Sequence, residues 1–304
     1  MVTNEKNMTT GSPGKLIITF AIPLMLGNIL QQFYTMADTM IVGQVVGVEA
    51  LAAVGAGDWL VWLVFGIMTG ITQGFSILVA QFYGAREKEN LKCAVAKSYI
   101  MTALLSVIVL AVSEGAVYHV LLFLQTPDNV IDQSTLYMRI YFLGMPFFML
   151  YNYGAAVLRA VGDTKRPLMF LIAAGIINAC LNMVLVIVFN LGVAGVAIAT
   201  IFSQFISCVL VLRCLNKTDA SYQLRFSKLK IKGYYLKQIF QVGIPAGIQS
   251  TVINFSNALL QSSVNSFGST AMAGYTAANN ILGFLYASIN SVTQACMSFT
   301  SQNY

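Results

Sequence analysis

The stretch GNILQQFYTMADTMIVG, residues 27–43, places a carboxylate, Asp38, inside a long apolar run. An ionised Asp at membrane depth costs roughly 2.5–3.5 kcal/mol, so such a residue usually faces the interior of a helix bundle or a water-filled path. Pro23 precedes the stretch and is expected to bend the helix or to free one of its carbonyls. Polar residues three or four positions apart share one face of this helix. They are Asn28, Gln31, Thr35 and Asp38.

The composition of the whole chain is that of a membrane protein. Of the 304 residues, 57% are hydrophobic and only 9% are charged, whereas soluble domains carry about 25% charged residues. The net charge of +6 therefore reflects membrane topology first, and we expect no nucleic-acid partner. The five cysteines form no CxxC pair, which favours buried thiols over a disulfide or a metal site.

Eight apolar runs are long enough to cross the hydrocarbon core of a bilayer, for which a helix needs about 20 residues. They predict an all-α polytopic membrane protein with short connections, apart from the segment between the sixth and seventh runs. The eight runs lie near residues 16–40, 51–80, 94–118, 133–158, 168–189, 193–214, 236–262 and 271–300.

The basic residues lie on one side of this topology. All 17 Lys and Arg residues except Arg139 fall before the first run, or in and beside the connections after the second, fourth and sixth runs. By the positive-inside rule, these segments face the cytoplasm. The sequence therefore predicts a multi-pass protein of a bacterial-type inner (plasma) membrane, with a cytoplasmic N-terminus.

Two parts of the chain resemble each other at a spacing of about 221 residues. AIPLMLGNILQQF (21–33) matches GIPAGIQSTVINF (243–255), and AQFY (80–83) matches SQNY (301–304). Because six spans separate the copies, the copies are expected to run parallel. We expect an N-terminal fragment of a protein of about twelve spans in two six-helix lobes, with a native eight-span protein as the alternative. The expected parts are the N-terminal lobe (1–214), a cytoplasmic inter-lobe linker (215–235) and the first two helices of a truncated C-terminal lobe (236–304).

Small residues four apart predict close helix packing in the second run and at the repeat-related positions of the last run. The first set is Gly66, Gly70 and Gly74, and the second set is Ala287, Ser291 and Ala295. A hinge role for the glycines is the alternative interpretation.

Polar residues recur inside the fifth and sixth runs. Asn178 and Asn182 are four apart and share a helix face, and Thr200 lies in the next run. Together with Asp38 they offer a carboxylate, two amide carbonyls and a hydroxyl, which suit a hard cation such as Na⁺. The carboxylate could instead bind a proton. For the two asparagines, hydrogen bonding between helices is the alternative.

The seventh run carries a neutral polar stripe with spacings of three or four residues. Such a face is expected to line a cavity rather than to contact lipid, although hydrogen-bonded helix packing also explains it. At the repeat position of Asp38 this run has Leu259 or Leu260, so we expect ion coupling to be confined to the first half. The stripe consists of Ser250, Asn254, Asn257, Gln261 and Asn265.

Four stretches together resemble the multidrug and toxic compound extrusion (MATE) family, and the likeness covers essentially the whole chain. LRAVGDTKRP is the most specific of the four. They are QQFYTMADTMIVG (31–43), QFYGA (81–85), LRAVGDTKRP (158–167), and the NxxxN of 178–182 followed by GVAGVAIAT (192–200).

The resemblance implies a twelve-helix transporter that exports organic cations and other drugs in exchange for H⁺ or Na⁺, without a further cofactor. Its first-lobe cation site would fall on Asp38, Asn178, Asn182 and Thr200. The position of Asn182 is often Asp in relatives, so a proton relay between two carboxylates is in doubt. We expect a monomer in the lipid bilayer. The drug cavity that the resemblance implies includes Gln31, Tyr34, Tyr137 and Asn152, beside the polar-face residues Asn28, Thr35, Asn254, Asn257 and Gln261.

Two other function classes fit the sequence less well. A flippase for lipid-linked oligosaccharides would need more cationic residues within its spans to meet pyrophosphate, and only Arg139 is clearly intramembrane. A membrane-embedded enzyme usually needs clustered His, Asp or Glu. The only His, His119, is predicted on the outer side, so we expect no catalytic residues.

Overall fold

Helices make up nearly all of the structure, a computed structural model that describes residues 8–123, 126, 128–218, 220, 222–224 and 269–304 and parts of 241–263. Among these residues there is no strand. Two α-helices, α1 and α6, continue directly into short π-helical segments, η1 and η2. The elements in chain order are α1 (Pro13–Ile41), η1 (Val42–Val46), α2 (Val48–Gly84), α3 (Lys88–Phe123), α4 (Asp128–Leu143), α5 (Met145–Ala160), α6 (Lys165–Asn182), η2 (Met183–Val188), α7 (Gly192–Lys217) and α9 (Ser269–Asn303).

The prediction of an all-α multi-pass membrane protein is confirmed. Within the described part of the chain, five helical segments are long and apolar enough to cross a membrane, and a bent pair makes a sixth. The predicted seventh span, 236–262, lies largely outside the described residues. The predicted eighth span is helical as α9, but α9 is not among the strongly apolar segments.

The predicted fourth span, 133–158, is not one straight helix. It consists of α4 and α5, which meet at Gly144 with a bend of 44°. Pro146 lies in the first turn of α5 and has no N–H to donate to the preceding helix. The helical hydrogen-bond pattern is therefore interrupted there. A side chain at Gly144 would also put its Cβ 2.8 Å from Ile201 Cγ1 of α7. The break lets α7 approach the bend closely.

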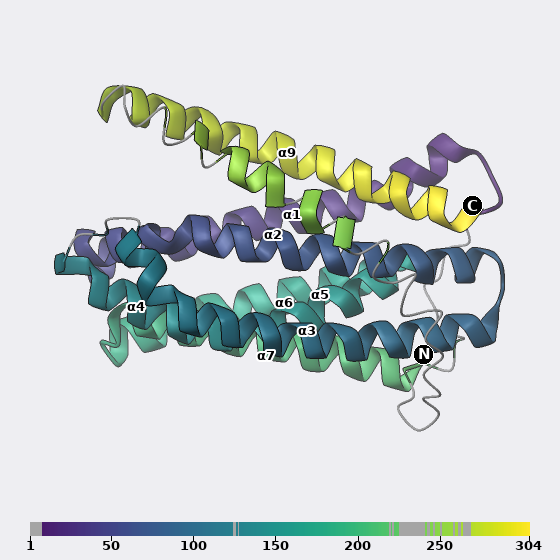
Figure 1. Ribbon diagram of the computed structural model, residues 1–304. Coiled ribbons are helices and arrows are strands. Elements are labelled where there is room, and N and C mark those ends of the chain that lie inside the picture. Colours follow the sequence, from purple (N-terminus) through teal and green to yellow (C-terminus); the bar gives the residue numbers. More distant parts are fainter. Residues whose placement is uncertain are drawn as a thin grey trace.

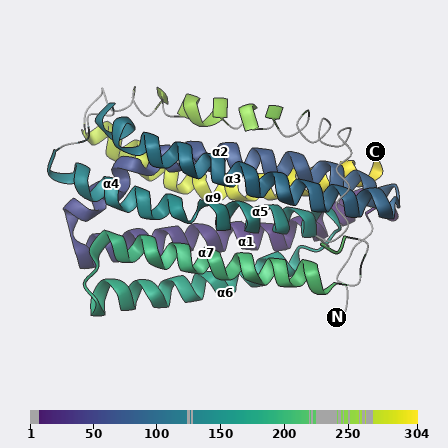
Figure 2. The ribbon, with the colours of Figure 1, turned by 60° about the horizontal axis from the view of Figure 1, so that its bottom comes forward.

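One end of the bundle gathers the basic connections. In Figure 1 the turn between α2 and α3, the end of α7 and the end of α9 all lie at the right-hand end, and Figure 2 shows the same grouping from another side. The start of α6 lies at this end as well, because Arg166 contacts Cys214 near the end of α7. The basic connections therefore lie together at one end of the bundle, as the sequence predicts. We call this the basic end.

Two large apolar clusters fill the bundle, one toward each end. The cluster at the basic end is built around Phe75, Tyr153 and Val211, and the other around Met138, Phe142 and Met149. Tyr222 and Leu224, which follow α7, are also buried in the first cluster. The beginning of the predicted linker is thus packed against the protein core.

The two repeat-related helices α2 and α9 run parallel, as the spacing of the repeat predicts. Their last turns meet, because a Cβ on Gly84 of α2 would overlap the backbone of Gln302 in α9. The small-residue stripe of α9 packs against α1, since Asn28 donates to Ser291 Oγ and Ala295 is buried beside α1 residues. Figure 1 shows α9 lying over α1 and α2.

Candidate cation site and its surroundings

A buried chain of polar side chains joins α6 to α7. Asn182 Nδ2 donates to Asn178 Oδ1 at 2.8 Å, and Asn178 Nδ2 donates to Thr200 Oγ1 at 3.3 Å. Thr200 Oγ1 in turn donates to the carbonyl of Val196, one turn earlier in α7, at 3.0 Å. Both asparagines are fully buried, and Thr200 is 6% exposed. The structure therefore brings together three of the four residues predicted for the cation site.

The local sequence explains this arrangement. The four-residue spacing stacks Asn178 over Asn182 on one face of α6, and α7 packs along that face. Gly195 lets α7 approach, because a Cβ there would lie 3.2 Å from the carbonyl carbon of Leu185. Directly after Asn182 the helix changes to the π-helical η2. Such π segments are frequent at functional sites, since they leave backbone groups less regularly paired.

Asp38, the fourth predicted residue, lies in α1, and its side chain is outside the described part of the structure. Its depth follows from the helices themselves. Gly27 of α1 faces Leu168 and Leu171 of α6, and both helices run away from the basic end. Because each residue of an α-helix advances about 1.5 Å, position 38 of α1 is level with the C-terminal part of α6, which contains Asn178 and Asn182. The π segments that follow, η1 and η2, touch each other.

The oxygen atoms of the Asn178–Asn182–Thr200 chain are neutral donors of the kind that hard cations accept. In the observed arrangement Asn178 Oδ1 accepts from Asn182 and Thr200 Oγ1 accepts from Asn178, and such pairing reduces the desolvation cost of buried polar groups. An amide oxygen has two lone pairs and a hydroxyl can rotate. These side chains could therefore rotate to coordinate a cation, with no change in the backbone.

The residues predicted for the substrate cavity are spread over several elements. Asn28 is half-buried between α1 and α9, where it donates to Ser291 Oγ at 2.9 Å and to the Ala287 carbonyl at 3.4 Å. Gln31, on the same helix, is exposed. The structure thus shows Asn28 in a contact between helices. The side chains of Tyr34, Thr35 and Gln261 lie outside the described residues.

The remaining cavity candidates differ in their surroundings. Tyr137 of α4 is 8% exposed, and its ring lies 5.7 Å from that of Tyr141. Asn152 of α5 donates to the carbonyl of Phe148 in its own helix at 2.9 Å. Asn254 is half-buried and Asn257 exposed. The described contacts do not bring these residues together with Asn178 and Asn182.

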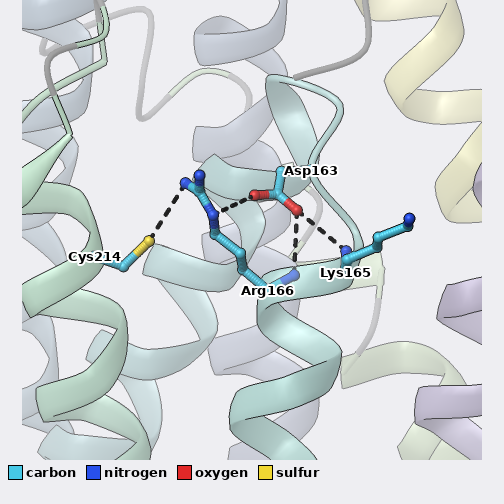
Figure 3. A network of polar contacts seen from close by, with 4 residues as sticks. All are labelled: Asp163, Lys165, Arg166 and Cys214. Atoms are coloured by element: carbon cyan, nitrogen blue, oxygen red, sulfur yellow. Dashed lines mark hydrogen bonds and ion pairs between the residues drawn. The ribbon is translucent and has the colours of Figure 1, made fainter. Parts of the chain in front are cut away.

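A second polar network lies at the basic end, within the LRAVGDTKRP stretch and the end of α7 (Figure 3). Asp163 Oδ1 accepts from the backbone N–H groups of Lys165 and Arg166 at 3.1 and 3.2 Å. Its Oδ2 lies 3.2 Å from Arg166 Nε, and Arg166 Nη1 donates to Cys214 Sγ at 3.6 Å. Asp163 is 1% exposed. The sequence signal was an acidic residue just before a helix with Arg three positions later.

We expect Asp163→Ala to destabilise the protein by about 1–3 kcal/mol, because two N–H groups at the start of α6 and the half-buried Arg166 would lose their acceptor. Asp163→Asn should recover part of the loss, since its amide oxygen still accepts from the backbone. Thermal unfolding in detergent, followed by size-exclusion fluorescence, measures both. Equal unfolding temperatures for Asp163→Ala and the unmodified protein would show that the network is dispensable.

The sequence of this chain matches those of known proteins. The MatE family model matches residues 23–184, which is more than half of the chain. The chain belongs to the MatE family. "Probable multidrug resistance protein YoeA" of Bacillus subtilis is 33% identical over the whole chain, which covers 66% of the length of that relative. "Probable multidrug resistance protein YpnP" of the same organism is 30% identical, with 98% of this chain and 66% of the relative covered.

A solved structure confirms the fold of this MatE family chain. An outward-facing multidrug resistance MATE family transporter of the MOP superfamily superimposes with a TM-score of 0.91 at 24% identity, covering 99% of this chain and 67% of the other. The chain thus spans about two thirds of the length of these relatives. Members of the MatE family are membrane transporters, not enzymes.

Proposed function

We propose that the protein containing this chain is a secondary active antiporter that exports organic cations and other drugs in exchange for Na⁺ or H⁺. The observation that carries the proposal is the buried Asn182–Asn178–Thr200 chain, level with position 38 of α1. A polar cluster of this kind at membrane depth is costly. Binding of a coupling ion would explain why the protein contains this polar cluster. The names of YoeA and YpnP support drugs as the substrates.

The coupling cation is proposed to bind at Asp38, Asn178, Asn182 and Thr200. One carboxylate and three neutral oxygen donors give a site with a single negative charge, which matches a monovalent cation. A proton would need the carboxylate alone, whereas Na⁺ would use the amide and hydroxyl oxygens as well. The number of donors gathered by α6 and α7 therefore favours Na⁺, and H⁺ remains the alternative to be tested.

The transport cycle is proposed to be alternating access. Helix α1 carries Asp38 and Pro23, and it packs on α6 on one side and on α9 on the other. In the proposed lobe arrangement, α6 belongs to the N-terminal lobe and α9 to the C-terminal lobe. Cation binding at Asp38 needs only to favour one arrangement of α1 over the other to shift the two states of the protein. Substrate binding would favour the opposite arrangement.

The proposed orientation puts the basic end in the cytoplasm, as the positive-inside rule requires. Drugs would enter from the inner leaflet or the cytoplasm into a cavity that includes the candidates on α1, α4 and α5. The protein is proposed to act as a monomer in the bilayer. An oligosaccharide flippase is less favoured, since Arg139, the intramembrane cation, is exposed on α4 and not directed into the core.

The ion is identified by efflux from proteoliposomes that contain the full-length protein and a fluorescent organic cation. We expect an imposed Na⁺ gradient to drive transport of the dye. Asn182→Ala should raise the Na⁺ concentration for half-maximal transport roughly tenfold, because one oxygen ligand is lost. Gln133→Ala, at an exposed position of α4, should leave the Na⁺ dependence unchanged and is the matched control.

Two outcomes decide between the ions. Transport driven by a pH gradient alone, with no response to Na⁺ in the unmodified protein or in Asn182→Ala, would assign H⁺ as the coupling ion. Absence of dye transport under both gradients would contradict the antiporter proposal itself.

A further inference from the structure

Gln302, in the last turn of α9, is bonded to two other parts of the chain at the basic end. Its Nε2 donates to the carbonyl of Ala160 at 2.7 Å, and its Oε1 accepts from the backbone N–H of Met8 at 3.0 Å. The side chain is 3% exposed. Ala160 is the last residue of α5, where helix carbonyls lack partners within the helix. Gln302 therefore satisfies a buried carbonyl that α5 cannot satisfy itself.

The N–H and the carbonyl of Met8 are both hydrogen-bonded to side chains of α9. Its N–H is bonded to Gln302, and its carbonyl accepts from Asn303 Nδ2 at 3.1 Å. The Met8 side chain is 2% exposed and packs in a small apolar cluster with Phe20 of α1 and Ala295 of α9. The residues before α1 thus form a short strap across the end of α9, and Figure 1 shows this purple segment beside the yellow end of the helix.

Gly84 completes the contact from the side of α2. A Cβ at this position would overlap the backbone carbonyl oxygen of Gln302. Only glycine allows α2 and α9 to come this close. Three parts of the proposed N-terminal lobe, the strap, the end of α2 and the end of α5, therefore enclose the last turn of a helix that belongs to the proposed C-terminal lobe.

Contacts between α1 and α9 farther from the basic end are of another kind. They are the Asn28–Ser291 hydrogen bond and a ring contact between Phe33 and Phe284 at 5.6 Å. These contacts join two helices along their lengths, whereas Gln302 joins three separate elements at one point. If α9 moved away from both α5 and the strap, the two hydrogen bonds of Gln302 would break together.

We propose that Gln302 is the latch that closes the cytoplasmic end of the transporter, by its contacts with Met8, Gly84 and Ala160. The proposal rests on the proposed alternating-access function. The latch is made in the outward-open state and must break before the protein opens to the cytoplasm. Two ordinary hydrogen bonds shift the ratio of two such states by roughly tenfold, which is enough to hold the end closed while still allowing it to open.

The test measures the width of the basic end directly, in the full-length protein without its native cysteines. Spin labels are placed at Lys88→Cys and Tyr304→Cys, two exposed positions on either side of the contact. We expect one short distance in the parent protein. Gln302→Leu, which keeps the bulk and removes both bonds, should add a population at longer distance, roughly ten times more abundant than in the parent.

Gly84→Ala should widen the same distance, because its Cβ displaces α9 without altering the Gln302 amide. Gln81→Leu is the matched control, since Gln81 is the repeat-related glutamine of α2 and none of the contacts above involves it. Unchanged distances in both Gln302→Leu and Gly84→Ala would overturn the latch. Failure of Gln302→Leu to fold would also overturn it, because a latch is dispensable in one of the two states.

The distance measurement needs no transport, so it separates the latch from the proposed function. A protein that shows the expected widening but no gradient-driven efflux would retain the latch and lose the antiporter proposal. A protein that exports the dye but shows no widening would retain the antiporter proposal and overturn the latch.

Discussion

Asp38→Asn is expected to abolish gradient-driven efflux of an organic cation from proteoliposomes, with a loss of about 100-fold or more. Asp38 is the single acid predicted for the cation site. Removing one partner of a buried charge pair costs roughly 3–5 kcal/mol, and this energy is what would couple the cation to the state of α1. Initial rates of dye efflux under an imposed Na⁺ or H⁺ gradient measure the effect.

Two further variants make the Asp38 result specific. Asp38→Glu keeps the charge and should retain part of the coupled transport. Asp132→Asn removes an exposed carboxylate at the start of α4 and should leave the rate unchanged. If Asp38→Asn folds normally and transports at the parental rate under both gradients, the assignment of the site to Asp38 is wrong.

Gly154→Val is expected to cause the largest loss of stability. A Cβ at Gly154 of α5 would lie 2.8 and 2.9 Å from the two Cγ atoms of Val211 in α7, and both residues are fully buried or nearly so. Inserting methyl groups into a well-packed core costs about 1–3 kcal/mol, and more when backbone must move. We expect the yield of folded protein to fall several-fold and the unfolding temperature to drop.

The matched control for Gly154→Val is Gly115→Val in α3. Gly115 is exposed, and a Cβ there would have nothing within 4 Å among the described residues. Both substitutions place the same side chain within a membrane-spanning segment, so any difference between them reports packing between α5 and α7. Equal unfolding temperatures for the two variants would contradict the close approach of these helices.

The helices themselves were largely predictable from the sequence. Apolar runs of about 20 residues must form helices in a bilayer because every backbone group has to be paired, and the Lys and Arg residues order the connections. The break between α4 and α5 was missed, although Gly144 and Pro146 signal it, because apolarity alone does not distinguish one span from two half-spans. The burial of Tyr222 and Leu224 was also missed, because the Lys and Arg residues that follow them dominate the pattern.

The candidate site was predictable in part. The four-residue spacing of Asn178 and Asn182 predicted their common face, and Thr200 was a candidate because it is a hydroxyl residue in the next apolar run. The hydrogen bond that joins the two helices through Thr200 depends on how α7 lies on α6. Gly195 contributes to that geometry, because a Cβ there would lie 3.2 Å from the carbonyl carbon of Leu185 in η2, the segment that continues α6. For Asn28, the polar pattern predicted an inward face, and only the packing showed that Ser291 lies on it.

By itself, the sequence determined a multi-pass helical protein of the MatE family, the order and direction of its helices, and the set of polar residues at membrane depth. Family membership rests on the resemblance of motifs and on the family match. The other properties follow from hydropathy, charge and helical periodicity, which act within single segments. Only the tertiary structure decided which of those polar residues meet, and that Gln302 joins Met8 and Ala160. Residues 302 and 8 lie at opposite ends of the chain, and no local pattern relates them. Their contact exists because α9 packs beside α1 and α2, where Gly84 leaves room for it.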